Sequence, residues 1–477
     1  MRFKFLKSLP FVQNGLAKLF STTTKQSKLH FQTSHRPLSP NQALKEHLKS
    51  NSTTKALLLF RDLLRKGISS IDSFSLLFVI KACTQKSLPI IGKQMHALVI
   101  NLGFETNIYL QTSLIDLYSG LGNIGDAHHV FDEIPAKNVV CWTALISGYV
   151  DNQEPDKALQ LFRQMQKGDV EPDQVALTVA LSACVDLGAL EMGEWIHAYV
   201  SRKKTLSKDL SLYNALINMY AKCGDIETAR GLFDGTKEKD VTTWTSMIVG
   251  HALHGQAGEA LQLFAAMKEE NKWARAKKRS FDSRSPLIVP NEVTFIGTLM
   301  ACSHAGMVEE GKMHFQSMIE DYGLKPRLSH IGCMVDLLCR GGLLQEAYDL
   351  IMDMPVQPNA VLWRTLLGAC GTRGNVELAA EARVRILELE GNRDGDNVIM
   401  SNIYAARGMW DEKIGIREKM KQRRAPGCSS IEVGSLINEF ITADDDHPSK
   451  REIYEVLEYL IETMKAHGYS PGMGRSL

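Results

Sequence analysis

Cysteine is the residue in this sequence whose chemistry could support a metal or redox site. The chain has nine cysteines, an odd number, and no two of them are spaced as CxxC. Structural zinc sites and dithiol redox centres commonly contain such a pair. Four cysteines instead fall at one register, each as the eleventh residue of a repeated unit, namely Cys83, Cys184, Cys302 and Cys370. We expect these four to be small side chains buried inside helices rather than ligands or redox groups.

The repeated unit that sets this register is clearest in residues 139–173. Each half carries apolar residues at helical spacing, which are Trp142, Leu145 and Tyr149 in the first half and Ala158, Phe162 and Met165 in the second. This spacing places the apolar side chains on one face of a helix. Residues 152–155 break the first helix, and Gly168 with Pro172 ends the second. The unit is therefore a pair of short helices that must stack on further copies to bury its apolar faces.

The copies occur in three lengths that rotate along the chain. Residues 241–270 repeat the unit described above, residues 108–138 and 210–240 hold a 31-residue version, and a longer version includes residues 174–209. Stacked units of this kind form a solenoid, whose stability is roughly a sum of unit and neighbour contributions.

Length, order and sequence of these units closely resemble the plant pentatricopeptide repeat family, in its subclass of P, L and S motifs. The phrases ALSACVDLGALEMGEWIHAYV and NALINMYAKCGDIETARGLFD carry the resemblance and distinguish it from tetratricopeptide repeats, which have similar length and bind peptides. It covers nearly everything after about residue 37. The resemblance implies an all-α fold, a right-handed α-solenoid of helix-hairpin repeats, with a short C-terminal extension containing a β-hairpin and a helix.

The resemblance also divides the chain. It gives a P motif at 37–72, L at 73–107, S at 108–138, P at 139–173, L at 174–209, S at 210–240, P at 241–291, L at 292–327 and S at 328–359, then an E extension at 360–429 and an E-plus segment at 430–477. The P motif at 241–291 is 16 residues too long, and the excess follows Glu270, where its second helix should end. We expect a tolerated surface loop there, with a basic contact to RNA phosphates as the alternative.

The E-plus segment has its own expected structure. Alternation predicts one strand containing Ile431 and Val433, and a second containing Ile437 and Ile441, with a turn at Gly434 and Ser435. A helix over about 449–467 follows. Many relatives continue into a DYW domain, a zinc-dependent cytidine deaminase with HxE and CxxC motifs. Neither motif occurs here, so we expect no catalytic site, metal or cofactor in this chain, and no enzyme activity.

The resemblance assigns base reading to the fifth residue of a P or S motif together with the last residue of that motif. The resulting pairs are Thr112 with Asn138 for A, Thr143 with Asp173 for G, Asn214 with Asp240 for U, and Thr245 with Asn291 for A, with weaker assignments of Asn41 with Asp72 to U and Thr178 with Asp209 to G. Leu77, Ile296 and Gly332 occupy fifth positions without base-reading groups. The implied target is 5′-UNAG(G/N)UANN, followed within about four nucleotides by an edited C. Thr, Asn and Asp at these places are alternatively ordinary helix N-caps and loop residues.

Charge is distributed unevenly. Residues 1–45 contain eight Lys or Arg and no Asp or Glu, which leaves 47 basic and 54 acidic residues, a charge of −7, in the rest of a chain whose formal total is +1. A generic polyanion-binding protein would be basic, so recognition of RNA must depend on local geometry. The Ser- and Thr-rich basic segment at 1–36 has the composition of an organelle transit peptide, mitochondrial rather than plastid, with a disordered basic arm as the alternative. No apolar run approaches the ~18 residues of a membrane span.

Together, the resemblance implies a site-recognition factor for C-to-U editing of organelle transcripts. Such a factor binds single-stranded RNA and recruits a DYW-type deaminase, or other editing factors, in trans. The alternatives are an RNA stabilisation or processing factor without editing, and a peptide-binding α-solenoid scaffold.

Overall fold

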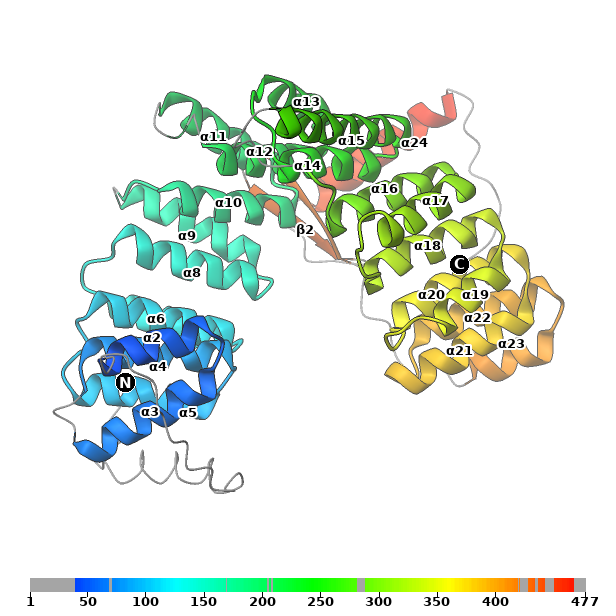
Figure 1. Cartoon of the computed structure of the whole chain (residues 1–477). Coiled ribbons are helices and arrows are strands. Elements are labelled where there is room, and N and C mark those ends of the chain that lie inside the picture. Colours follow the sequence, from blue (N-terminus) through cyan, green and yellow to red (C-terminus); the bar gives the residue numbers. More distant parts are fainter. Residues whose placement is uncertain are drawn as a thin grey trace. The chain divides into compact units, whose positions relative to one another are not determined.

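The computed structural model describes residues 39–67, 71–168, 170–203, 206, 209–280, 288–418, 420, 428–433, 436–441 and 450–466. The expected transit peptide at 1–36 and the expected turn at Gly434 and Ser435 lie outside these residues. The described chain is almost entirely helical, and it divides into two compact units, Met1–Leu232 and Phe233–Leu477 (Figure 1). Each unit is a stack of helix pairs, as the solenoid prediction required.

The first unit contains the helices up to α12 and most of α13. They are α2 (Pro40–Lys49), α3 (Thr53–Lys66), α4 (Ser73–Gln85), α5 (Pro89–Asn101), α6 (Ile108–Gly120), α7 (Ile124–Asp132), α8 (Val139–Asp151), α9 (Pro155–Lys167), α10 (Gln174–Leu187), α11 (Leu190–Arg202), α12 (Leu210–Cys223) and α13 (Ile226–Gly235), the last of which crosses the unit boundary. In the pairs from α2 and α3 to α10 and α11, the first helix packs on the second, and it also packs on the first helix of the next pair, as α6 does on α8.

The second unit repeats this arrangement and adds two strands. Its elements are α14 (Val241–Leu253), α15 (Ala257–Ser280), α16 (Glu292–Ala305), α17 (Val308–Glu320), α18 (Leu328–Gly341), α19 (Leu344–Met352), α20 (Ala360–Arg373), α21 (Val376–Glu390), α22 (Asp394–Ala406), α23 (Trp410–Arg417), β1 (Cys428–Val433), β2 (Leu436–Ile441) and α24 (Lys450–Ala466). No helix among the described residues combines the length and apolar character needed to cross a bilayer.

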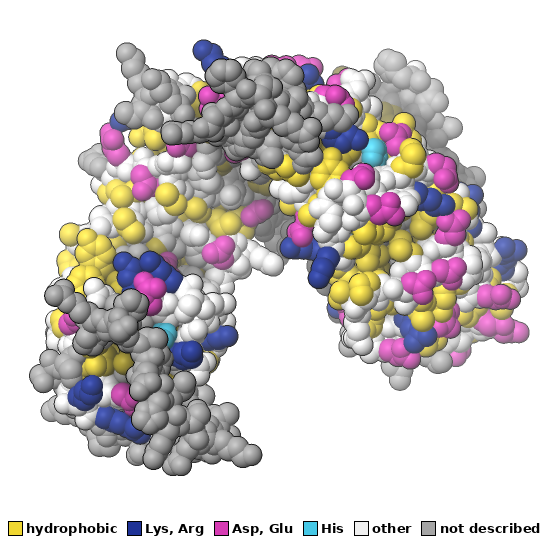
Figure 2. All heavy atoms as spheres, viewed as in Figure 1, with side chains coloured by type: hydrophobic (Ala, Val, Ile, Leu, Met, Phe, Trp, Pro, Cys, Tyr) yellow, Lys and Arg dark blue, Asp and Glu magenta, His cyan; other side chains and the backbone are white. Residues whose placement is uncertain are grey.

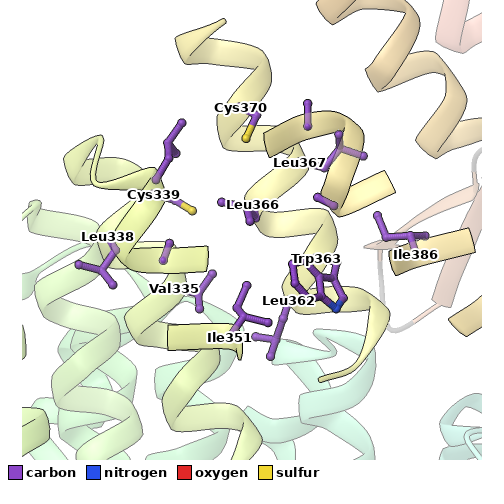
Figure 3. Close-up of a cluster of buried hydrophobic side chains, with 14 of the residues drawn as sticks. Val335, Leu338, Cys339, Ile351, Leu362, Trp363, Leu366, Leu367, Cys370 and Ile386 are labelled. Carbon is purple, nitrogen blue, oxygen red and sulfur yellow. The ribbon is translucent and has the colours of Figure 1, made fainter. Parts of the chain in front are cut away.

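Buried apolar side chains join neighbouring helix pairs, and in the second unit one cluster extends from α18 to α23. Figure 3 shows this cluster, which includes Leu338 of α18, Ile351 of α19, Trp363 and Leu366 of α20, and Ile386 of α21. Trp363 and Leu366 are 2% and 0% exposed. Because each helix pair shares its core with the next pair, no pair completes its own core.

The four cysteines of the repeated register lie in this core, as predicted. Cys83, Cys184, Cys302 and Cys370 are all 0% exposed, each inside the first helix of its pair. Burial raises the pKa of Cys83 and of Cys302 to about 12, and that of Cys370 to about 11. Such thiols stay protonated near neutral pH, which fits a packing role.

In the longer repeats, a glycine in the second helix permits this helix to approach the first helix of the next repeat closely. A Cβ added to Gly92 of α5 would lie 2.8 Å from Cδ2 of Leu117 in α6. Gly193 and Gly311 hold the same place in their units and face Met219 and Leu337 in the same way. The spacing between α5 and α6 therefore depends on the absence of a side chain at Gly92.

A histidine to tyrosine hydrogen bond recurs between successive helix pairs of the first unit. The histidine Nδ1 lies 2.7 to 3.0 Å from the tyrosine hydroxyl in three pairs, His96 with Tyr118, His128 with Tyr149, and His197 with Tyr220. Burial lowers the pKa of His96 and His197, and burial raises the pKa of Tyr118 and Tyr220 to about 12. Burial thus favours the neutral forms of His96 and His197, and in these forms the two histidines connect neighbouring helix pairs.

The extra residues of the P motif at 241–291 differ from their prediction. The sequence analysis placed the end of the second helix near Glu270, but α15 continues without a break to Ser280 and is 24 residues long, against 13 for α9. Residues 271–280 contain Ala, Arg and Lys, which favour helix, and no Gly or Pro to end it. The insertion therefore begins as additional helix rather than as a loop.

The C-terminal strands form an antiparallel hairpin. β1 pairs with β2 in a register that sets Cys428 opposite Ile441 and Val433 opposite Leu436. α24 then covers nearly the range expected for the last helix.

Candidate functional site

The last residue of each repeated unit is the N-cap of the helix that opens the next unit. In six of the units the side-chain oxygen of this residue accepts the backbone N–H three residues further on, at 2.8 to 3.0 Å. The six predicted site residues in this position are Asp72, Asn138, Asp173, Asp209, Asp240 and Asn291. The cap occupies one polar atom of each side chain and fixes its direction. Asn138, Asp173 and Asn291 are otherwise exposed.

The fifth residues lie one turn into the first helix of each unit and are more enclosed. Thr143 and Thr245 are 9% and 6% exposed, and Asn214 is 5% exposed. The hydroxyls of Thr112, Thr143 and Thr178 donate to the carbonyl four residues earlier, at 2.8 to 2.9 Å. A threonine hydroxyl has one proton, so these three side chains can meet a ligand only as acceptors.

In the first predicted pair, the two side chains contact each other directly. Nδ2 of Asn41 donates to Oδ2 of Asp72 at 2.7 Å, while Oδ1 of Asp72 accepts the N–H of Ser75 at 2.8 Å. Burial raises the pKa of Asp72, but the hydrogen bonds from Ser75 and Asn41 outweigh it, and the net pKa lies below its usual value. The structure therefore brings these two residues together.

Two further pairs meet through one residue of the following helix. Thr112 Oγ1 lies 3.4 Å from Cys141 Sγ, and Asn138 Oδ1 accepts the N–H of Cys141 at 3.0 Å. Thr245 and Asn291 meet in the same manner at Thr294, 49 residues after Thr245.

The remaining pairs are placed differently. Among the described residues, no side chain of the following helix bridges Thr143 to Asp173 or Thr178 to Asp209. The bridging position, held by Cys141 and Thr294 in other repeats, is occupied here by the apolar Ala176 and Leu212. Asn214 lies in the first compact unit, Met1–Leu232, and Asp240 lies in the second, Phe233–Leu477. Each residue is therefore described only within its own compact unit.

A set of exposed apolar residues near these pairs was not predicted from the sequence. They are the second residue of a first helix and are 50% to 74% exposed, namely Phe74, Tyr109, Val140, Val175, Val293 and Val361. Their register relative to the helix start would have identified them, but a search for apolar helix faces assigns any apolar residue to the core. An apolar surface next to hydrogen-bonding groups suits a flat heteroaromatic ligand.

An internal ion pair fills the corresponding place in the E extension. Arg364, the fifth residue of the unit that begins at Ala360, donates from Nε and Nη2 to Asp396 at 2.8 and 3.1 Å and from Nη2 to Glu390 at 2.7 Å. The hydrogen bonds that Arg364 donates to these two carboxylates raise its pKa further above its usual value. Since its Nε and Nη2 already have carboxylate partners, Arg364 is not equivalent to the paired polar residues of the earlier repeats.

The described residues show neither a metal-binding cluster nor, on the face drawn in Figure 2, a patch of one charge. On the face shown in Figure 2, Lys and Arg side chains lie among Asp and Glu side chains. Within the described residues, no group of three or more His, Cys, Asp or Glu side chains is arranged to hold a metal ion.

Three models of known protein families match parts of this chain. The model described as "PPR repeat" matches residues 112–139, 211–241, 242–271, 293–322 and 332–357, the "PPR repeat family" model matches 137–186, and the "E motif" model matches 373–432.

Several curated relatives are pentatricopeptide repeat-containing proteins of Arabidopsis thaliana. One, named as chloroplastic/mitochondrial, is 38% identical over 430 residues, which cover 87% of this chain and 65% of the relative. Another, named as chloroplastic, is 36% identical over 434 residues, which cover 90% of this chain and 69% of the relative. A third, also chloroplastic, is covered to only 54% of its length, so the chain spans about half to two thirds of these proteins.

Among solved structures, the chain resembles the pentatricopeptide repeat protein PPR10 in complex with an 18-nt psaJ RNA element. The TM-score is 0.61 at 16% sequence identity, and the match covers 85% of this chain and 57% of that one. This likeness agrees with the solenoid of helix hairpins seen here.

Proposed function

The chain belongs to the pentatricopeptide repeat family, and from that membership we propose that it binds single-stranded RNA sequence-specifically and marks sites for C-to-U editing in organelle transcripts. The observation that carries the proposal is the recurrent meeting of a fifth residue and a last residue at the start of the next helix, as for Thr245 and Asn291. A recurring pair of polar groups is what a code of one base per repeat needs.

The hydrogen-bond roles left over after capping support the base assignments. The cap uses Oδ1 of Asn138, so its Nδ2 remains as a donor, while Thr112 remains as an acceptor. The Watson–Crick edge of adenine offers one acceptor and one donor, which such a pair complements. Asp173 offers only acceptors beside the acceptor Thr143, and guanine offers two adjacent donors, N1–H and N2–H.

The exposed apolar residues support the same function. Tyr109 and Val140 are the second residues of successive first helices and are 74% and 52% exposed. A base held between two such side chains would stack in any sequence, which gives affinity, while the polar pair gives the preference. The relative in complex with RNA, PPR10, belongs to the same family. Binding of this kind is compatible with a chain of formal charge +1, because it depends on local contacts.

We assign the RNA-reading role to Thr112, Asn138, Thr143, Asp173, Asn214, Asp240, Thr245 and Asn291, with weaker contributions from Asn41, Asp72, Thr178 and Asp209. The E region, where the E motif model matches 373–432, recruits a DYW-type deaminase or other editing factor in trans. Residues 1–36 direct the protein to an organelle, the mitochondrion first and the plastid as the alternative.

The test is to sequence organelle transcripts from plants with and without this protein and to score every C-to-U position. Loss of editing at one or a few cytidines, each a few bases beyond a sequence such as AGNUA, is the expected result. A chain truncated after Asn359 should keep RNA binding and lose editing. If every edited position is unchanged while transcript ends or abundance shift, the proposed editing role is wrong and an RNA-processing role replaces it.

A further inference from the structure

The third residue of the helix that follows a reading pair contacts both members of that pair at two places, at Cys141 for Thr112 and Asn138 and at Thr294 for Thr245 and Asn291. At four such third positions the residue carries a hydroxyl or thiol group and is 0% or 1% exposed, namely Ser75, Cys141, Thr243 and Thr294. A buried polar group normally has a hydrogen-bonding reason to be there. At each of these places the backbone N–H binds the side chain of the preceding last residue.

Thr294 shows the arrangement most completely. Oδ1 of Asn291 accepts the N–H of Thr294 at 2.9 Å and its Oγ1–H at 3.0 Å. The N–H of Asn291 donates back to Oγ1 of Thr294 at 3.1 Å. Oγ1 of Thr245, on α14, lies 2.7 Å from Oγ1 of Thr294, on α16. One hydroxyl thus connects both members of the pair.

Counting protons fixes the direction of these hydrogen bonds. Thr294 has a single hydroxyl proton, and Asn291 Oδ1 can only accept, so donation to Asn291 requires Thr245 to donate to Thr294. Oγ1 of Thr294 then donates once and accepts twice, which is its full capacity. Nδ2 of Asn291 is left as the donor available to a ligand, and Oγ1 of Thr245 is left as an acceptor.

We propose that the third residue of the following motif is a positioning residue for base recognition, and that Thr294 orients Thr245 and Asn291 as one acceptor and one donor that select adenine. This inference rests on the proposed RNA-reading function. Thr294 itself is 0% exposed and acts through its two neighbours. Preorganised partners lose less freedom on binding, so their preference between bases is sharper.

The other units form a graded series. Thr243 Oγ1 donates to Oδ1 of Asp240 at 2.9 Å, as Thr294 does to Asn291. Cys141 offers a thiol, a weaker hydrogen-bonding group, 3.4 Å from Thr112. Ala176 has no polar group to orient Thr143 and Asp173. The Thr143 and Asp173 pair should therefore discriminate less sharply than its residue types alone suggest.

The experiment uses the full chain and four RNAs of the implied target sequence that differ only in the seventh base, which Thr245 and Asn291 read. We expect Thr294→Val to reduce the preference for A over the next-best base about threefold to tenfold, the effect of one hydrogen bond. Thr294→Ser should restore the preference. Preference at the third base, read by Thr112 and Asn138, should not change.

Thr298→Val is the matched control. Thr298 is also 0% exposed, lies one turn further along α16, and donates its hydroxyl to the carbonyl of Thr294 at 3.0 Å without touching the pair. It should lower thermal stability to a similar extent and leave the preference for A unchanged. A second variant, Ala176→Ser, supplies the missing hydroxyl and should sharpen the preference for G at the fourth base.

Three results would overturn the inference. The first is an unchanged preference for A in Thr294→Val, and the second is an equal loss of preference in Thr294→Val and Thr298→Val, since either makes Thr294 a structural residue only. The third is an unchanged preference for G in Ala176→Ser. If the wild-type chain binds all four RNAs equally or none of them, the proposed RNA-reading function itself fails, which is a distinct outcome from failure of the variants.

Discussion

Replacing Asp173 by asparagine separates base recognition from helix capping at a single residue. Asp173 caps α10 by accepting the N–H of Ala176 at 2.8 Å, and its side chain is exposed. Asparagine caps helices about as well as aspartate, so Asp173→Asn should change the free energy of unfolding by only a few tenths of a kcal/mol. Asp173→Ala removes the cap and should cost about 1 kcal/mol.

The expected change in RNA binding is larger. The acceptor-only carboxylate of Asp173 becomes an amide whose Oδ1 takes over the cap and whose Nδ2 is a donor. With Thr143 still an acceptor, the pair should then favour A over G. A good pair of base contacts contributes about 1 to 3 kcal/mol of discrimination, so the ratio of affinities for G and A should move about 5- to 150-fold.

The assay is fluorescence anisotropy with two RNAs that differ only at the fourth base, together with thermal unfolding of each variant. Asp173→Ala is the control, since it should lose both the cap and the discrimination. The reasoning is refuted if Asp173→Asn binds both RNAs more weakly by the same factor, because Asp173 would then be a structural cap alone.

Three other perturbations follow from the packing. Gly297→Ala would place a Cβ 2.8 Å from Cγ2 of the β-branched Val249 and should destabilise the fold by about 1 to 3 kcal/mol in chemical denaturation. Gly258→Ala has open space around its Cβ, so the same measurement should show no change or a stabilisation of up to about 1 kcal/mol. Tyr109→Ala should weaken binding of every RNA about fivefold or more with no change in base preference, which titration with the same oligonucleotides checks. Burial lowers the pKa of His197 below its usual 6.5, so in this pH range the unfolded chain binds more protons than the folded chain. The free energy of unfolding should therefore fall as the pH is lowered from 7.5 to 5.5, and it should fall less in His197→Gln. Urea unfolding at each pH measures both changes.

The helical solenoid could be predicted because its determinants are local. Apolar spacing within residues 139–173, the cysteine register and the positions of Gly and Pro each act over a few residues. The prediction also gave the N-cap as the alternative role of Asp173, and the structure has this cap. Periodicity did not predict the length of α15, since a repeat length says nothing about how far a helix-forming insertion continues beyond Glu270.

Two aspects of the site could not be predicted from sequence patterns. The contact between Thr245 and Thr294 joins residues 49 positions apart across an insertion, and it depends on how α14 packs on α16. The exposure of Val140 depends on which neighbours cover the first turn of α8, and hydropathy alone does not distinguish it from the buried Leu145.

The shared position of each last residue, which ends one unit and caps the next helix, has a consequence for how such proteins evolve. Asparagine and aspartate are both among the best capping residues. At a base edge they differ, because the asparagine amide can donate a hydrogen bond and the aspartate carboxylate can only accept one. An exchange between them at Asn138 or Asp173 keeps the cap oxygen, and under the proposed RNA-reading function it should alter the base that is preferred. Mutations that retarget the protein can therefore spread without compensating changes in the core, and a lineage can acquire new RNA targets one nucleotide at a time.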